Sequence, residues 1–351
     1  MNGEKSLGLR VPLKEAERVR TYLHTHNLLR KDLQIHRDSS FVYLPVQKIP
    51  AIMKLYETAE QLFPKKEQRP SSYKELVDLP SDLRQELPTS YDIIGSIILI
   101  KLPQSLYRFK GKIGAALLQT HKQVTTVCLS APVTGELRTR EISIIAGRRQ
   151  TRTVHREFGL GLSVDIRTCY FSPRLATERR RVAGCVQDGE IVVDMFTGVA
   201  PFSLMIAKYA HPQVIYAVDK NKDAFLFASE NIRRNNAVDT IEAICMDAKQ
   251  LPFFLAEKRV KADRIIMNLP FSAWLFFPVA LQIASGSCII HYYDILAEDA
   301  IENRLAALCD VAKHNNIKTR YSSVRKIKSY TPREFYIGVD ITVEKEDADV
   351  A

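Results

Sequence analysis

The feature that most constrains the fold is an alternation of apolar, strand-like runs with helix-like segments after residue 190. The runs lie at 191–196, 214–219, 241–247, 263–270 and 288–293. Alternating strands and helices with apolar strands are typical of a parallel sheet covered by helices on both faces. We therefore expect an α/β domain over residues 183–351, with its ligand site beyond the carboxyl ends of the strands.

Two smaller α+β domains are expected before this sheet, at residues 1–72 and 73–182, because 351 residues exceed what one hydrophobic core usually serves. The elements expected in the first are a helix within 11–29, a strand at 41–46 and a second helix at 51–63. In the second, the run DIIGSIILIKLP after Tyr91 is expected to form one apolar strand that contains Gly95.

The net charge of +10 is concentrated in one segment of the chain. Between Lys101 and Arg181 there are sixteen Lys and Arg against five Asp and Glu, whereas the remainder is nearly neutral. A basic block in an otherwise neutral protein indicates a polyanionic partner such as nucleic acid or an anionic lipid surface. A solvated face without a partner is the other interpretation.

Three of the predicted strands end in a carboxylate, at Asp194, Asp219 and Asp247. Asp219 follows Asp194 by 25 residues, a spacing at which an acidic residue can bind the ribose hydroxyls of an adenosine-bearing ligand. Asp247, with Ala248 after it, is placed to meet the exocyclic amine of an adenine. Each carboxylate could instead cap the helix that follows it.

The turn between the first strand and its helix is a candidate cofactor loop. It runs from Asp194 through Phe196, Gly198 and Val199 into a helix. A glycine in such a turn lets a ligand approach the backbone and the positive end of the helix. The turn is neither a P-loop nor a G-x-G-x-x-G motif, and ordinary turns also contain glycine.

The fourth strand ends in Asn268-Leu269-Pro270. This sequence offers a side-chain amide and a rigid backbone carbonyl to a planar target at the same sheet edge. Base-modifying methyltransferases use related Asn-x-Pro loops to hold the nitrogen that is alkylated. A simple loop with turn residues is the alternative.

Six segments together resemble the tRNA (guanine-N1)-methyltransferases of archaea and eukaryotes, which modify guanosine 37, 3′ of the anticodon. They are CYFSPRLATERRRV, VVDMFTGVAPFS, YAVDKNKDA, DRIIMNLP, IIHYYD and SYTPREFYIGVDI. The resemblance is strong over 91–345 and weaker over 1–70. It implies a Rossmann-like class I methyltransferase domain that uses S-adenosyl-L-methionine and releases S-adenosyl-L-homocysteine. It also implies a small N-terminal tRNA-binding domain and tRNA as the partner.

The resemblance further implies residue roles. Glu178 matches the general base that removes the N1 proton, and Arg138 matches the arginine placed against guanine O6. Tyr170 matches a residue against cofactor and target, and Asn268 and Pro270 match the loop that holds the target guanine. Arg138 could equally contact a phosphate, and Glu178 could form an ordinary helix salt bridge.

Cofactor contacts are expected at the strand ends and the first turn. The residues are Asp194, Phe196, Gly198, Val199, Asp219, Lys220, Asp247, Ala248 and Asn268. The chain departs from the family pattern at Ala200, where glycine is usual, and at Thr197, where alanine is usual. Ala200 would be strained if the turn needs a positive φ. His155 and His291 are expected to be hydrogen-bonded rather than catalytic.

Three other functions stay open at this point. Two are wybutosine-pathway reactions at the same tRNA position, transfer of the aminocarboxypropyl group and methylation of an imidazopurine. The third is a catalytically silent RNA-binding protein. Six cysteines without a C-x-x-C pair argue against a disulfide framework and a cysteine-built zinc site, and no signal sequence is seen. We expect a cytoplasmic monomer without metal or membrane association.

Overall fold

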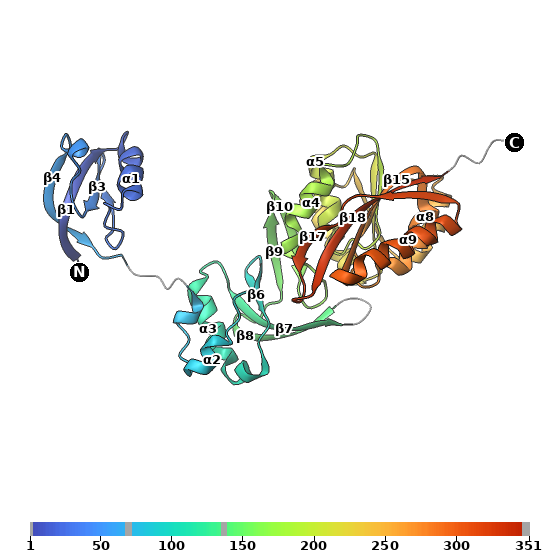
Figure 1. The fold of residues 1–351 in the computed structure, drawn as a ribbon, viewed down its shortest axis with the longest axis horizontal. Helices are drawn as coiled ribbons and strands as arrows, with labels where there is room; N and C mark the ends of the chain where they lie inside the picture. The colour runs from blue at the N-terminus through green and yellow to red at the C-terminus, as the bar shows by residue number, and fades with distance from the viewer. Residues whose placement is uncertain (1–2, 67–71, 135–138, 346–351) are drawn as a thin grey trace. The chain divides into compact units, whose positions relative to one another are not determined.

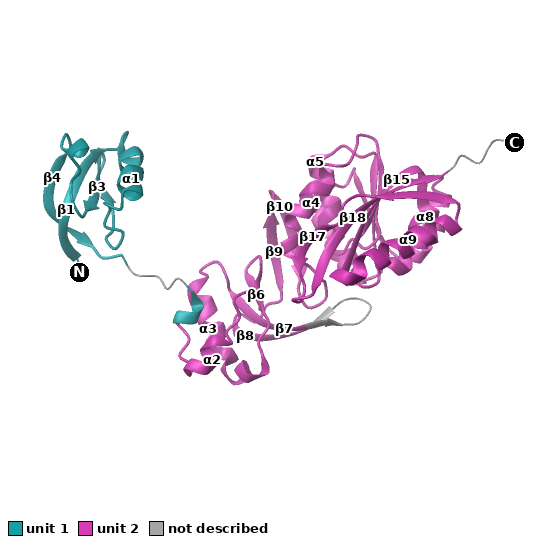
Figure 2. Cartoon of the chain, viewed as in Figure 1, with its two compact units in different colours: residues 1–75 teal, residues 76–351 magenta. Residues whose placement is uncertain are grey.

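The computed structural model describes residues 3–66, 72–134 and 139–345. They form two compact units, residues 1–75 and 76–351, coloured separately in Figure 2. Figure 1 labels their helices and strands. Within the described ranges, no helix is long and apolar enough to cross a membrane.

The first unit is a four-stranded antiparallel sheet with one α-helix against it, in the order β2-β3-β1-β4. Its elements are β1 (Gly3–Pro12), α1 (Ala16–Thr25), β2 (His36–Arg37), β3 (Phe41–Val46), η1 (Ala51–Met53), β4 (Glu57–Pro64) and η2 (Tyr73–Glu75). Leu9 and Leu44 of the sheet and Leu23 of α1 are fully buried in one core.

The helix predicted at 51–63 is wrong. Only the short turn η1 is helical there, and β4 pairs with β1 in register from Gly3↔Pro64 to Arg10↔Glu57. Residues 57–62 are rich in Glu, Ala, Gln and Leu, which favour helix. Backbone pairing with β1 overrides this local preference. The first predicted helix is shorter than expected, because Val11 belongs to β1.

The second unit begins with a four-stranded sheet in the order β5-β6-β7-β8 and a separate hairpin, β9-β10. The elements are α2 (Ser81–Gln85), β5 (Asp92–Ile94), β6 (Ile97–Ile100), η3 (Gln104–Phe109), α3 (Lys110–Thr120), β7 (Thr126–Thr134), β8 (Thr139–Gly147), β9 (Arg152–Glu157) and β10 (Leu160–Asp165).

The single strand expected around Gly95 is in fact two. β5 and β6 pair antiparallel through Ile94↔Ile97, and Gly95 forms the turn between them with φ +54°. A Cβ on this glycine would lie 2.3 Å from Oγ1 of Thr153. The apolar run therefore folds back on itself at the residue that tolerates both the φ value and the close approach.

The rest of the second unit is an eight-stranded sheet in the order β13-β12-β11-β14-β15-β18-β16, with β17 paired to β18. Its elements are η4 (Pro173–Leu175), α4 (Ala176–Ala183), β11 (Ile191–Asp194), α5 (Pro201–Tyr209), β12 (Val214–Asp219), α6 (Lys222–Arg234), β13 (Ile241–Cys245), η5 (Ala248–Gln250), α7 (Leu251–Glu257), β14 (Ala262–Met267), η6 (Ala273–Phe276), α8 (Phe277–Ile283), β15 (Ala284–Ala297), η7 (Glu298–Ala300), α9 (Ile301–His314), β16 (Ile317–Tyr321), β17 (Arg325–Ser329) and β18 (Glu334–Lys345).

Strands β11 to β15 are parallel, and β18 inserts antiparallel beside β15. Helices α4, α5 and α6 contribute to the core on one face, and α7, α8 and α9 to the core on the other. Neighbouring strand residues alternate between the two cores, Val192 in the first and Val193 in the second. The predicted α/β parallel-sheet fold is confirmed.

The order of the strands reverses between β11 and β14. From β11 the chain proceeds to β12 and β13 on one side, and then returns to β14 and β15 on the other. Such a reversal opens a crevice at the carboxyl ends of the two central strands, where ligands bind in open α/β sheets. The segments after Asp194 and Met267 therefore face each other across this point.

Candidate active site

A cavity of about 850 Å³ lies at this switch point, a size typical of small-molecule sites. Ten of the residues singled out from the sequence line it: Tyr170, Phe196, Gly198, Val199, Asp219, Lys220, Asp247, Ala248, Asn268 and Pro270. Nine of them lie at the carboxyl ends of β11, β12, β13 and β14 or in the segments after these strands, and Tyr170 lies between β10 and η4. Residues from β6, β7 and the β17–β18 connection complete the wall.

The turn after β11 is held by Asp194, which lies behind the cavity surface. Its Oδ2 accepts hydrogen bonds of 2.8 Å from the hydroxyls of Thr197 and Ser203. Its Oδ1 has no hydrogen-bond partner within the described part of the chain. Burial raises the pKa of Asp194 to about 6. Asp194 thus orders the turn from beneath.

Two residues of this turn have a positive φ. Gly198 has φ +58° and Ala200 has φ +67°. The turn therefore does need a positive φ at Ala200, where glycine is usual in the family. The left-handed region costs a residue with a Cβ about 1–2 kcal/mol. Ala200 is fully buried, and the surrounding core holds it there. A Cβ on Gly198 would meet only the carbonyl oxygen of Tyr170, at 3.8 Å.

Asp219 connects the turn to the end of β12. Its Oδ2 accepts a 2.7 Å hydrogen bond from the backbone N–H of Gly198, and its Oδ1 accepts one of 2.9 Å from Asn221. Burial raises the pKa of this carboxyl, against these backbone hydrogen bonds. Each oxygen keeps a second acceptor position that a vicinal diol could use.

Two aromatic rings contribute to the apolar part of the cavity wall. Phe196 and Phe276 meet edge to face with centroids 5.0 Å apart, and both line the cavity, as does Ala248. Asp247 also serves as the cap of η5, since its Oδ1 accepts from the N–H of Lys249 at 2.9 Å. Asp247 thus caps the helical turn that follows it, as the alternative interpretation predicted, and it also lines the cavity.

Asn268 and Pro270 lie on the opposite side, after β14. The Tyr336 hydroxyl of β18 donates a hydrogen bond to Oδ1 of Asn268. Because Oδ1 is already an acceptor, the amide nitrogen Nδ2 is the group oriented to donate to a ligand. Next in the chain, Phe271 has φ +72°, and its N–H donates to the buried Asp294 at 2.8 Å.

Glu178 is placed differently from a residue on the cavity wall. It lies on α4 and, among the described residues, is not one of those that line the cavity. Its carboxylate accepts from Nε and Nη2 of Arg181, at 3.0 and 2.8 Å, and from the Tyr293 hydroxyl at 2.9 Å. The helix ion pair considered from the sequence is therefore present, but it is buried, with Glu178 7% exposed. Burial and the Glu178 carboxylate both raise the pKa of Tyr293.

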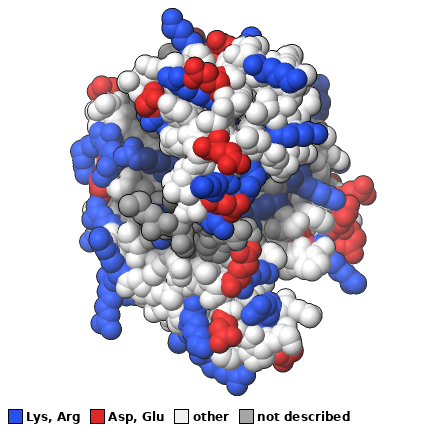
Figure 3. Space-filling view, turned by 90° about the vertical axis from the view of Figure 1, so that its left-hand side faces the viewer, with Lys and Arg blue, Asp and Glu red and all other residues white. Residues whose placement is uncertain are grey.

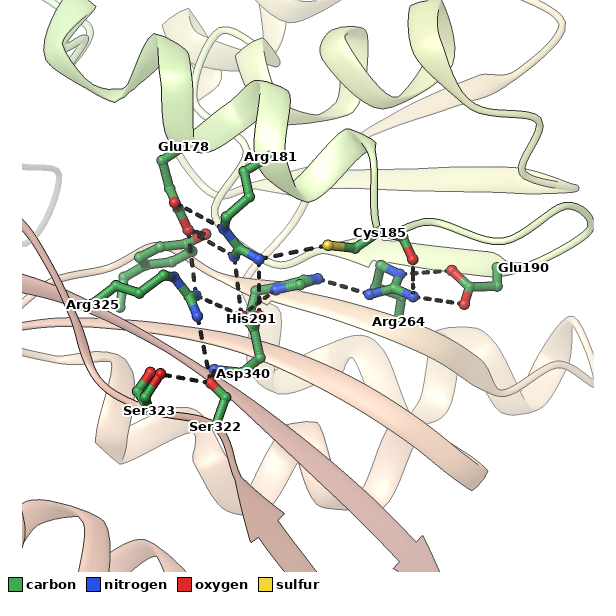
Figure 4. A network of polar contacts seen from close by, with 11 residues as sticks. Glu178, Arg181, Cys185, Glu190, Arg264, His291, Ser322, Ser323, Arg325 and Asp340 are labelled. Atoms are coloured by element: carbon green, nitrogen blue, oxygen red, sulfur yellow. Dashed lines mark hydrogen bonds and ion pairs between the residues drawn. The ribbon is translucent and has the colours of Figure 1, made fainter.

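Glu178 is one end of an extended buried network, drawn in Figure 4. Arg181 also binds Asp340, and Asp340 accepts from His291 at 2.7 Å. The other ring nitrogen of His291 meets Arg264 at 2.9 Å, and Arg264 pairs with Glu190. Since Arg264 can only donate, Nε2 of His291 accepts and Nδ1 carries the proton. Burial lowers the pKa of His291, so it is a neutral member of this network.

His155 is also held by a hydrogen bond, since its Nδ1 accepts from the N–H of Gly95. Both histidines are thus hydrogen-bonded, as expected. Arg138 lies outside the described residues.

Sequence reasoning missed two residues, Lys328 of β17, which lines the cavity, and Tyr336 of β18, which donates to Asn268. No periodicity or strand-end position marks them, and the only available signal was their place in or near the SYTPREFYIGVDI segment.

Comparison with known proteins gives a consistent result. The TRM5/TYW2 methyltransferase domain matches residues 153–319, the TYW2 N-terminal domain 73–151 and the tRNA methyltransferase 5 N-terminal domain 8–54. The tRNA (guanine(37)-N(1))-methyltransferase Trm5b of Pyrococcus abyssi is 40% identical over 96% of this chain and 99% of its own length.

Two solved structures extend the comparison. The complex of aTrm5 with tRNALeu has a TM-score of 0.71 at 31% identity, covering 96% of this chain and 99% of that one. The structure of Methanocaldococcus jannaschii TYW2 with AdoMet has a TM-score of 0.56 at 25% identity, covering 73% of this chain and 100% of that one.

Proposed function

The chain belongs to the TRM5/TYW2 methyltransferase family, and from this we infer that it is a tRNA (guanine37-N1)-methyltransferase. It transfers a methyl group from S-adenosyl-L-methionine to N1 of the guanosine 3′ of the anticodon. One observation carries the inference beyond family membership. A single cavity at the switch point joins a glycine turn and strand-end carboxylates, on one side, to Asn268-Leu269-Pro270, on the other.

The methylating branch of the family is favoured over the wybutosine branch. Identity to Trm5b is 40% over 96% of the chain, whereas the aminocarboxypropyltransferases and TYW2 structures are 25–32% identical over 73–77% of it. Residues 8–54 match the N-terminal domain of tRNA methyltransferase 5. The Asn268-Leu269-Pro270 loop is the expected form for N1 methylation, so the two wybutosine reactions are the less supported assignments.

The residues of the cavity fit S-adenosylmethionine. Above Gly198 there is open space where any other residue would place a Cβ, and both Asp219 oxygens can still accept hydrogen bonds. Phe196 and Phe276 supply apolar surface in the cavity wall, which suits an adenine ring. When bound, the cofactor supplies an electrophilic methyl group.

The remaining chemistry falls to the protein and the target base. Guanine N1 carries a proton at neutral pH, so a base must remove it and negative charge develops on O6. Glu178 is the proposed base and Arg138 the proposed cation at O6. Support for Glu178 comes from its buried carboxylate and from two tyrosines that link it to the target loop. Tyr293 contacts Glu178, its ring is 6.1 Å from that of Tyr336, and Tyr336 contacts Asn268.

The basic segment is the proposed tRNA-facing surface of the second unit. Its described basic side chains are mostly exposed: Lys101, Arg108, Lys110, Lys112, Lys122, Arg148, Arg149, Arg152, Arg156, Arg167 and Arg174. On the face drawn in Figure 3, Lys and Arg side chains are widely spread with acidic ones between them. Neutralising phosphates through such residues makes binding fall steeply with salt.

We also propose that the protein is a cytoplasmic monomer. Sedimentation at micromolar concentration would test the monomeric state.

The function is tested with tRNA transcripts that carry guanosine or adenosine at position 37. We expect N1-methylguanosine in nuclease digests of the guanosine transcript only, identified by mass spectrometry, and Asn268→Ala should lower the yield. Product at another position, an aminocarboxypropyl adduct, or tight RNA binding without any transfer would each contradict the assignment.

A further inference from the structure

We propose that Phe271 and Tyr330 form a stacking platform, at the rim of the cavity, for a nucleobase next to the target guanosine. The inference rests on the proposed function and adds a binding subsite to it. Both rings line the cavity and are about half exposed, at 46% and 47%. Their centroids are 5.5 Å apart and their planes are inclined by 73°.

The backbone of Phe271 has a strained conformation, and its ring is exposed. A bulky residue with φ +72° is uncommon, and strain of this kind persists only where surrounding contacts impose it. Here the contact is with Asp294, which has no exposed surface and accepts the N–H of Phe271 at 2.8 Å. Asp294 is itself fixed by the Tyr292 hydroxyl at 2.6 Å and by Arg304 at 2.7 Å.

Tyr330 is also held in place through its backbone. It sits in the connection from β17 to β18, where its N–H donates to the carbonyl of Glu334 at 2.9 Å. Two exposed aromatic rings thus lie beside each other, each with its backbone N–H hydrogen-bonded within the protein. Ordering them beforehand reduces the entropy that a ligand must overcome on binding.

The occupant we assign is a base of the single-stranded RNA that flanks the target. A guanine that enters the cavity must leave its stack, which also removes a stacking partner from its neighbours. Aromatic side chains recover that stacking regardless of base identity, because every base has a π-face. Phe271 directly follows Asn268-Leu269-Pro270, so the platform adjoins the proposed target loop. Lys328 and Ser329, on the same rim, suit the sugar-phosphate backbone.

The test combines two variants with tRNAs that lack one base. Tyr330→Leu and Phe271→Leu keep apolar bulk and a Cβ but remove the ring. They are measured for kcat/KM on tRNA with an intact loop, or with an abasic nucleotide at 36 or at 38. S-adenosylmethionine affinity is measured by calorimetry. Tyr321→Leu and Phe253→Leu are the matched controls, since both rings are exposed and lie outside the described cavity lining.

We expect each platform variant to lose about tenfold in kcat/KM on the intact tRNA, in line with the contribution of one stacked base. One of the two abasic tRNAs should lose a similar factor with the wild-type protein, and combining it with Tyr330→Leu should add little further loss. Cofactor affinity should not change. Three results would overturn the platform. The loss in kcat/KM from Tyr330→Leu could multiply with the loss from the abasic tRNA, the platform variants could behave like the control variants, or their affinity for S-adenosylmethionine could fall. Failure of the proposed function shows separately, as a wild-type protein that does not methylate the intact tRNA.

Discussion

The hydroxyl of Tyr336 on β18 donates a hydrogen bond to the side-chain oxygen of Asn268, 68 residues earlier in the chain. Tyr336 is 1% exposed, so this contact is made within the protein and not through solvent. It fixes which end of the Asn268 amide faces the cavity. Strand β18 therefore determines that Asn268 has its amide N–H group, and not its oxygen, available at the proposed target loop.

Tyr336→Phe should weaken turnover without weakening cofactor binding. The amide of Asn268 would lose its fixed orientation, and one hydrogen bond contributes about 0.5–1.5 kcal/mol, which corresponds to a several-fold effect. We expect kcat to fall by about two- to tenfold, measured in single-turnover assays with saturating tRNA. Tyr321→Phe on β16 is the control. A change in cofactor affinity in place of kcat would contradict this role of Tyr336.

Glu178→Gln should lower kcat by about 100-fold or more, because a general base contributes about 10²–10⁴-fold. It should also lower the midpoint of thermal unfolding, since Arg181 loses a charged partner. Glu190→Gln separates the two effects, because Glu190 makes a similar paired contact with Arg264 but is not assigned to catalysis. Both variants should be destabilised, and only Glu178→Gln should lose turnover per folded molecule. Turnover retained in both would assign Glu178 to structure alone.

Gly198→Ala should reduce affinity for S-adenosylmethionine more than it reduces stability. An alanine at this position must adopt the φ of +58° that Gly198 has, which costs about 1–2 kcal/mol. Its added Cβ meets no protein atom closer than 3.8 Å and so occupies ligand space. Calorimetry should show cofactor binding weakened by about tenfold or more, with denaturant unfolding showing the smaller loss. Unchanged cofactor affinity would remove the turn from the cofactor site.

Asp194→Asn should change how stability depends on pH. The pKa of Asp194 is raised to about 6 in the folded protein, above its unfolded value near 3.8. The folded state therefore binds the proton more tightly, and the stability gained at low pH is lost as pH rises from about 4 to about 6. A shift of about two pKa units corresponds to about 3 kcal/mol. We expect urea unfolding to show that the free energy of unfolding of Asp194→Asn, relative to the wild type, is higher at pH 7 than at pH 4.5. The same difference between variant and wild type at both pH values would refute the assignment.

The sheet could be predicted from sequence because its strands are buried on both faces. Runs such as Ile191 to Val193 are apolar throughout, and an aspartate ends both β11 and β12. The edge strand β4 could not be predicted in this way. Its residues are mostly exposed, and only pairing with β1 makes it a strand.

The site could be predicted where a role belongs to one segment of the chain. Asp219 and Gly198 are recognisable from their positions at a strand end and a turn. The ion pair of Glu178 with Arg181 lies within one helix and could be considered from the sequence. The contacts of Glu178 with Tyr293 and Arg325 were not predictable, because β15 and β17 are brought to this helix only by the fold. For the same reason a surface salt bridge and a partly buried network at this helix could not be distinguished from the sequence.

The insertion of β18 beside β15 has a consequence for biosynthesis. The turn at Gly198 and the loop at Asn268 leave the ribosome well before Tyr336, Asp340 and Arg325 do. A polypeptide that stops before β18 lacks the Tyr336 contact to Asn268 and the Asp340 contact to Arg181. We therefore expect incomplete polypeptides of this kind not to modify RNA.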